Sequence, residues 1–181
     1  DENFLLEFRN DFQKLLQYNL GSNASCLFNN EKNGRLKIYK IPPTVYNPQV
    51  GKYNTQSLFV FGKEIKEQFI KKFSNPKVQL KVLVLVDFEI YRSGFAGTLF
   101  GEAEVDGDIA IASLSPLREN SNGFLTRERA IKESLHVIGY TLGLKQCKTP
   151  SCVMGPSKTL EDIDKRNTSY CSDCIKLIFD K

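Results

Sequence analysis

Residues 136–154 read HVIGYTLGLKQCKTPSCVM, and this stretch decides the fold that we expect for the chain. It joins the end of an apolar-periodic segment to Cys147 and Cys152, which have four residues between them. A second pair, Cys171 and Cys174, follows with two residues between its members. Both spacings are typical of closed tetrahedral sites in which four thiolates bind one zinc ion. We therefore predict one structural Zn2+ held by these four cysteines.

Two other states of these cysteines stay open at this point: a pair of disulfides, or reduced and buried thiols. Zinc is favoured because thiols in the cytosol stay reduced. The segment 175–179 after the second pair is typical of a short helix, whose N-terminal dipole would favour a thiolate. The fifth cysteine, Cys26, precedes two apolar residues and is expected to be a small core residue.

The segment ahead of the cysteines predicts a long helix over residues 126–142, ended by Gly143 where a left-handed residue is usually glycine. At 3.6 residues per turn, its side chains divide into two faces. An apolar stripe for the core is formed by Ile131, Leu135, Ile138 and Leu142. The opposite face carries Glu133, His136 and Tyr140, which we expect to point away from the core.

Outward from this helix, periodicity predicts an α/β (α+β) fold in which a mixed, twisted β-sheet packs with helices. The other expected elements are a helix at 4–16 ending near Gly21, a strand at 36–41, a helix at 58–73, a buried strand at 80–86, and strands at 98–105 and 108–113 joined by an Asp106-Gly107 turn. We expect one domain over 1–181. Within it, 1–143 would form the sheet and helices, and 144–181 the four-cysteine subdomain.

Composition limits the function classes. The 181 residues carry a net charge of +4 that is spread along the chain, so nucleic-acid binding by a zinc-knuckle module is a weaker alternative. No apolar run approaches the roughly 20 residues of a membrane span, and no secretory signal is visible, so a cytoplasmic location is expected. The chain contains one histidine, His136. A site that needs two histidines from one chain is therefore excluded.

With these residues in place, the chain resembles the archaemetzincins, a family of metzincin zinc peptidases. Their signature is His-Glu-x-x-His-x-x-Gly-x-x-His-Cys, then x-x-x-x-Cys-x-Met, then Cys-x-x-Cys, which the stretch from His136 to Met154 and the second cysteine pair follow in spacing. Upstream blocks, Tyr46-Asn47, Tyr53-Asn54 and 100–103, are also similar. The resemblance implies a metzincin-like fold in which three histidines bind a catalytic zinc and the glutamate is the general base. Met154 matches the methionine turn.

Every catalytic position of that signature but one carries a different residue in this chain. His136 matches the first ligand, whereas Tyr140 and Gln146 stand at the second and third, and Val137 replaces the general base. A frame shifted by four residues, which keeps Glu133 and Gly139 as the motif's glutamate and glycine, puts a leucine at the third ligand position and displaces the cysteines and Met154 by four residues. Glu133 and His136 alone would form a two-point site. The resemblance thus implies a pseudopeptidase without catalytic zinc; an active metallopeptidase with unusual ligands is the alternative.

Three further expectations follow from the resemblance. Metzincins hold substrate as an added strand along a sheet edge, so the segment 101–105 is the candidate edge for a peptide or protein ligand. His136 and Tyr140 would line this cleft, and Met154 would pack beneath them. Replacing His136 by alanine is expected to leave stability nearly untouched, whereas Cys171→Ser should unfold the C-terminal third.

Overall fold

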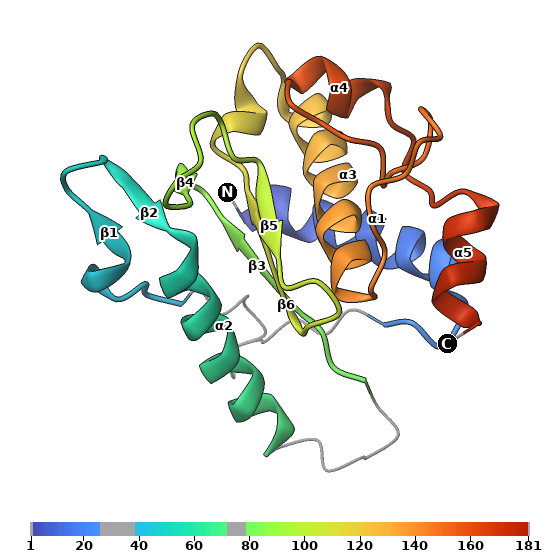
Figure 1. The fold of residues 1–181 in the computed structure, drawn as a ribbon, viewed down its shortest axis with the longest axis horizontal. Helices are drawn as coiled ribbons and strands as arrows, with labels where there is room; N and C mark the ends of the chain where they lie inside the picture. Colours follow the sequence, from blue (N-terminus) through green and yellow to red (C-terminus); the bar gives the residue numbers. More distant parts are fainter. Residues whose placement is uncertain (1, 26–38, 72–78, 181) are drawn as a thin grey trace.

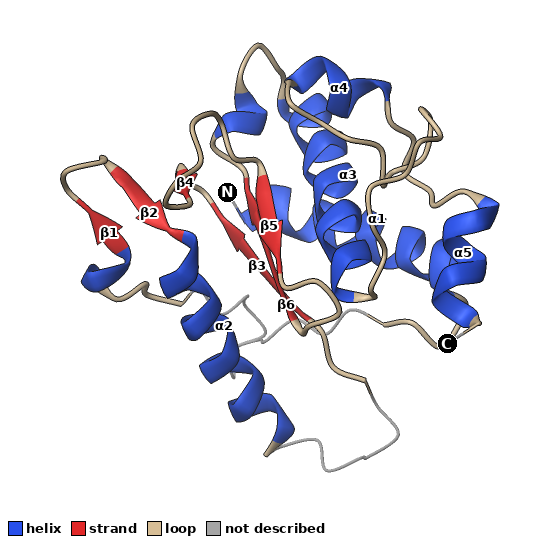
Figure 2. Cartoon of the chain, viewed as in Figure 1, coloured by secondary structure: helices blue, strands red, loops and turns tan. Residues whose placement is uncertain are grey.

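The computed structural model describes residues 2–25, 39–71 and 79–180, and the sheet at its centre is mixed, as predicted (Figures 1 and 2). Strand β6 (Ile109–Ser113) lies between β3 (Val82–Val86), to which it is parallel, and β5 (Gly101–Ala103), to which it is antiparallel. A second small sheet has the order β1-β2-β4, from Tyr46–Asn47, Lys52–Asn54 and Ile90–Tyr91. It too combines an antiparallel and a parallel pair.

The central strand explains how the helices are layered. In β6, Ile109 and Ile111 belong to the core cluster on the side of helix α2 (Thr55–Ile70), whereas Ala110 and Ala112 belong to the cluster beneath helix α3 (Gly123–Thr141). This alternation is the period of two of a strand that is buried on both faces. The small alanine side chains leave room for α3 to lie close to the sheet. Helix α1 (Glu2–Leu20) packs against the far side of α3 (Figure 1).

Most of the expected elements are confirmed with shifted ends. Helix α1 buries Phe8, Phe12 and Leu16 and ends at Gly21, whose φ is +88°. Helix α2 begins earlier than predicted because the side chain of Asn54 accepts hydrogen bonds from the amides of residues 56 and 57. Strand β5 is shorter than expected. The strand expected at 36–41 is wrong for residues 39–41, which are irregular; residues 36–38 and Cys26 lie outside the described ranges.

Helix α3 is confirmed, with Asn122 as its N-cap and Gly143 at φ +80° just beyond its end. Its predicted division into a core face and an exposed face is wrong. Glu133 and His136 are only 3% and 6% exposed, because residues 144–180 fold back over the face that carries them. Figure 1 shows this C-terminal part wrapping along α3. The helix is therefore buried on all sides over most of its length.

The C-terminal part contains two short helices. The first, α4 (Leu160–Lys165), was missed by periodicity, although Thr159 and Asp162 form a capping box at its start. The second, α5 (Ser172–Phe179), confirms the helix expected after the second cysteine pair. Among the described residues, no helix is both long and apolar enough to cross a bilayer.

Candidate metal centre

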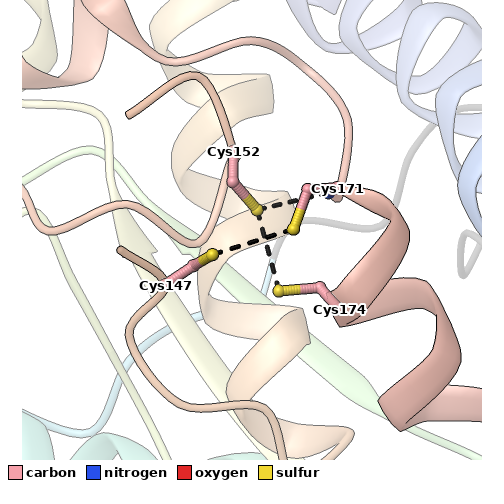
Figure 3. Close-up of side chains that lie close together, drawn as sticks. All are labelled: Cys147, Cys152, Cys171 and Cys174. Atoms are coloured by element: carbon pink, nitrogen blue, oxygen red, sulfur yellow. Dashed lines mark hydrogen bonds between the residues drawn. The ribbon is translucent and has the colours of Figure 1, made fainter. Parts of the chain in front are cut away.

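The four predicted cysteine ligands come together in one cluster (Figure 3). Their Sγ atoms all lie within 4.8 Å of one another. The Sγ atoms of Cys147 and Cys171 are 3.7 Å apart, and those of Cys152 and Cys174 are 3.8 Å apart. A tetrahedral zinc site with Zn–S bonds of about 2.3 Å has sulfur–sulfur edges of about 3.8 Å. The cluster therefore has the dimensions of a zinc tetrathiolate.

Backbone amides point at these sulfurs. The amide of Thr149 donates to the Cys147 Sγ at 3.4 Å, and the amide of Met154 donates to the Cys152 Sγ at the same distance. Both pairs are two residues apart, so the two turns repeat one local geometry. The amide of Cys171 donates to the Cys152 Sγ at 3.3 Å. Such donors stabilise thiolates rather than neutral thiols.

Without a cation, the four sulfurs could not all be thiolates. Burial raises the pKa of Cys152 and that of Cys174. At Cys171 burial also acts to raise the pKa, but hydrogen bonds, the first of them from the Cys174 amide, outweigh it and bring the pKa to about 7. A bound zinc ion would supply the charge that four neighbouring thiolates require and would join the chain segments that carry them. All four positions are protein ligands, so such a site is closed to substrate.

The cluster also joins parts of the chain that are far apart in sequence. The amide of Cys147 donates to the carbonyl of Met154 at 2.9 Å, which closes the loop that carries the first pair. The amide of Val153 donates to the carbonyl of Ser169 at 2.9 Å, which links that loop to the second pair. The cluster is thus fixed by main-chain bonds as well as by its ligands.

The three positions that match the signature's histidines also lie together, but their side chains interact with one another. The rings of His136 and Tyr140 meet edge to face, with centroids 4.9 Å apart. The side chain of Gln146 lies close enough to Tyr140 to act on the pKa of its phenol, which it lowers against the larger effect of burial. Val137 is 1% exposed, and a methyl group added to Gly101 would come within 2.7 Å of it. The three positions therefore lie together, but they carry a histidine, a tyrosine and a glutamine in place of three histidines.

Arg166 was missed in the sequence and is the main addition to this site. Its guanidinium pairs with the Glu133 carboxylate at 2.8 Å, and both residues are buried. It also donates to the carbonyl of Val153 at 3.2 Å. No local pattern could have revealed a partner 33 residues away. Glu133 is thus held by Arg166, and among the described residues the four cysteines are the only group of three or more potential His, Cys, Asp or Glu ligands.

His136 is held in one tautomer. Its Nδ1 lies 2.9 Å from the carbonyl oxygen of Val153, and because a carbonyl can only accept, Nδ1 carries the proton. Burial lowers the pKa of His136, so the ring is neutral at pH 7. Burial also raises the pKa of Tyr140, whose phenol therefore stays protonated. Two hollows of about 550 and 470 Å³ lie elsewhere, and neither is lined by these two residues.

The fold and the cluster together define a mixed α/β protein with four cysteines placed to hold a metal ion. Comparison with known proteins agrees: the family model of Peptidase family M54 matches residues 33–180. An archaemetzincin of Methanocaldococcus jannaschii is 32% identical over 146 residues, which are 78% of this chain and 74% of that protein. An archaemetzincin of Archaeoglobus fulgidus is 40% identical over 90 residues, or 50% and 54% of the two chains. This chain belongs to peptidase family M54.

Solved structures agree on the fold. The crystal structure of the Archaeoglobus fulgidus archaemetzincin complexed with malonate has a TM-score of 0.71 and 26% identity, covering 98% of this chain and 93% of that one. A zinc-dependent peptidase from Methanocorpusculum labreanum has a TM-score of 0.79 at 18% identity, covering 98% and 96%. The predicted fold class and the resemblance to archaemetzincins are both confirmed.

The lowered pKa of His136 gives a pH prediction. In the unfolded chain the imidazole titrates near 6.5, whereas the folded protein resists its protonation, so acid favours unfolding. We expect the stability of the wild type relative to His136→Asn to fall between pH 7.5 and 5.5, by up to about 1.4 kcal/mol. Denaturant titrations of both proteins at the two pH values measure this difference.

Cysteine protonation affects both proteins alike and cancels in that comparison. A difference in unfolding free energy that stayed constant, or grew on acidification, would contradict a buried, neutral His136. The burial also reverses the sequence-based expectation for His136→Ala. The variant should now lose stability, because a buried ring and its hydrogen bond to Val153 are removed.

Proposed function

We propose that this chain is a catalytically inactive member of peptidase family M54, with one structural zinc on its four cysteines and no catalytic zinc. The observation that carries the proposal is the state of the three positions that match the signature's histidines. The His136 ring packs against the ring of Tyr140, and the Gln146 side chain lies close enough to Tyr140 to act on its pKa, so the three positions form one cluster. What remains offers one imidazole nitrogen where a catalytic zinc needs three protein ligands.

Each substitution weakens metal binding for its own reason. A phenol must lose its proton to bind zinc, and the burial of Tyr140 raises its pKa and opposes that loss. The amide oxygen of Gln146 is a neutral donor that suits harder ions. Glu133, which could have been a substitute ligand, is engaged by Arg166 inside the protein. Binding zinc here would require breaking a buried ion pair, which is costly.

Val137 stands at the position of the general base, and its surroundings do not suit a base either. Val137 cannot accept a proton from a water molecule. Its side chain is buried against Gly101, so a water molecule has no access to it there. An active metallopeptidase with unusual ligands would therefore need both a metal and a base from groups other than those at the signature positions.

Metal content tests this proposal. Protein purified without added metal should contain one zinc per chain, and His136→Ala should keep it. Cys171→Ser should lose the metal and melt at least about 6 °C lower, because even about 3 kcal/mol of the stabilisation by structural zinc has that effect in a chain of this size. Elemental analysis and thermal melts measure both quantities.

The matched control is Ser172→Ala, which changes the exposed neighbour of Cys171 and should match the wild type. Equal melts for the wild type and Cys171→Ser would remove the structural zinc from the proposal. A reproducible second zinc in the wild type that disappears in His136→Ala would overturn the loss of the catalytic site.

The arrangement of the three positions predicts that a metal site can be rebuilt. Because Tyr140 and Gln146 already lie together beside His136, the double variant Tyr140→His/Gln146→His should bind a second zinc. Tyr140→His alone should still bind one. Peptidase activity should stay absent in both variants, since Val137 supplies no base. If the folded double variant still held only one zinc per chain, the backbone at these three positions would no longer place three imidazoles around one metal ion.

We further propose that a peptide or protein segment binds along the edge of β5 that has no strand partner among the described residues. In the order β3-β6-β5 this strand is paired with β6 on one side. Main-chain bonds join Phe100 to Ser113 and Glu104 to Ile109, so the even-numbered residues face β6. Gly101 and Ala103 thus direct their main-chain groups outward, as an added strand requires.

This binding mode is tested by removing one outward amide. Ala103→Pro deletes the Ala103 N–H without breaking the pairing with β6, and Ala103→Ser keeps the N–H as a control. In fluorescence anisotropy with a panel of unstructured labelled decapeptides, the wild type and Ala103→Ser should bind members of the panel that Ala103→Pro does not. Absence of binding to the folded wild type, or equal binding by Ala103→Pro, would refute the proposal.

A further inference from the structure

A buried amide on the N-terminal helix reaches the segment that leads into the second cysteine pair. Asn19 lies near the end of α1 and is 4% exposed. Its side-chain nitrogen donates to the carbonyl of Thr168 at 3.1 Å, and to that of Leu15 at 2.7 Å. Its side-chain oxygen accepts from the amide of Tyr170 at 2.8 Å. One side chain thus binds the main chain on both sides of residue 169, as a neighbouring strand would.

This contact continues into the metal centre. The residue after Tyr170 is Cys171, and its amide donates to the Sγ of Cys152. The Tyr170 hydroxyl donates to the carbonyl of Leu135 at 2.6 Å, which holds the same residue from the side of α3. Consecutive amides of this short segment are therefore bound by Asn19 and by a metal ligand. A shift of the segment would move Cys171 and would also remove a donor from Cys152.

An asparagine at position 19 would be an unfavourable choice if its only role were to pack in the core. Asparagine is a weak helix former, and a buried amide must find partners for all its polar atoms. The same helix places Phe8, Phe12 and Leu16 in the core, so an apolar residue at position 19 would continue that stripe. The partners that Asn19 does find, apart from Leu15 in its own helix, belong to the segment before Cys171. Its role therefore points to the cysteine cluster.

We propose that Asn19 is a positioning residue for the four-cysteine metal centre, through which helix α1 and metal binding are coupled. The inference rests on the proposed structural zinc. Outer partners that orient metal ligands raise metal affinity by limiting their motion before the metal binds. Because coupling between two equilibria is reciprocal, bound zinc must in turn fasten the end of α1.

The first experiment measures zinc affinity by competition with a chromophoric chelator. Asn19→Ala should bind zinc about tenfold more weakly than the wild type, the lower end of the effect of losing an outer partner. The control is Tyr18→Ala, which changes the preceding residue of the same helix, a side chain that is 78% exposed, and should leave affinity unchanged. An asparagine that only stabilised α1 would lower the melting points of the zinc-bound and zinc-free proteins equally, without changing zinc affinity.

The second experiment needs no variant, so it decides the matter even if Asn19→Ala fails to fold. Hydrogen exchange of the wild-type chain should quicken at the end of α1 when zinc is removed by a chelator. Equal affinity of Asn19→Ala and wild type, or unchanged exchange in α1, would overturn this inference while leaving the structural zinc in place. A wild type that holds no zinc would overturn both, so elemental analysis separates the two failures.

Discussion

The packing of residues 144–180 against the polar face of α3 is the constraint on which the rest of this structure depends. It buries Glu133, and a buried carboxylate is tolerated only when it is paired. Arg166 supplies the pair, and its guanidinium also binds the carbonyl of Val153, which in turn receives the proton of His136. The fold of the C-terminal segment and the chemistry of the signature helix are therefore parts of one network.

The sequence predicts those elements whose cause is local. Gly143 marks the end of α3, the apolar run at 80–86 marks β3, and the cysteine spacing predicts a cluster that the structure assembles. Sequence patterns fail to predict a feature when its cause lies far along the chain. Periodicity correctly groups Glu133 with His136 on one face but cannot say that a segment beginning at residue 144 will cover it. Likewise Asn19, in a helix with a clear apolar stripe, gives no local sign of its partners at 168 and 170.

The upstream blocks show a third case, in which family resemblance locates residues that physical patterns leave unexplained. Tyr46-Asn47 and Tyr53-Asn54 lie in a stretch that reads as turns, yet they form β1 and the end of β2. Two of them have definite local roles. Asn54 caps α2, and the side chain of Asn47 donates to the hydroxyl of Tyr91 at 2.7 Å on β4, across the intervening strand β2. Strands of two or three residues are too short for alternation to reveal them.

The two metal positions of the family signature differ in what they contribute to the fold. The four cysteines lie on loops that main-chain hydrogen bonds close and at the start of α5, so the cluster lies where several chain segments meet. The first two signature positions, 136 and 140, lie on a helix that is already held by its packing, by Met154 against Gly139 and by Tyr170 on Leu135. Tyr140 is therefore accommodated there against the ring of His136 without disturbing the helix. The packing of α3 therefore does not depend on its signature positions being histidines, whereas the cysteine cluster lies in the same segment that supplies Arg166 to the buried carboxylate of α3.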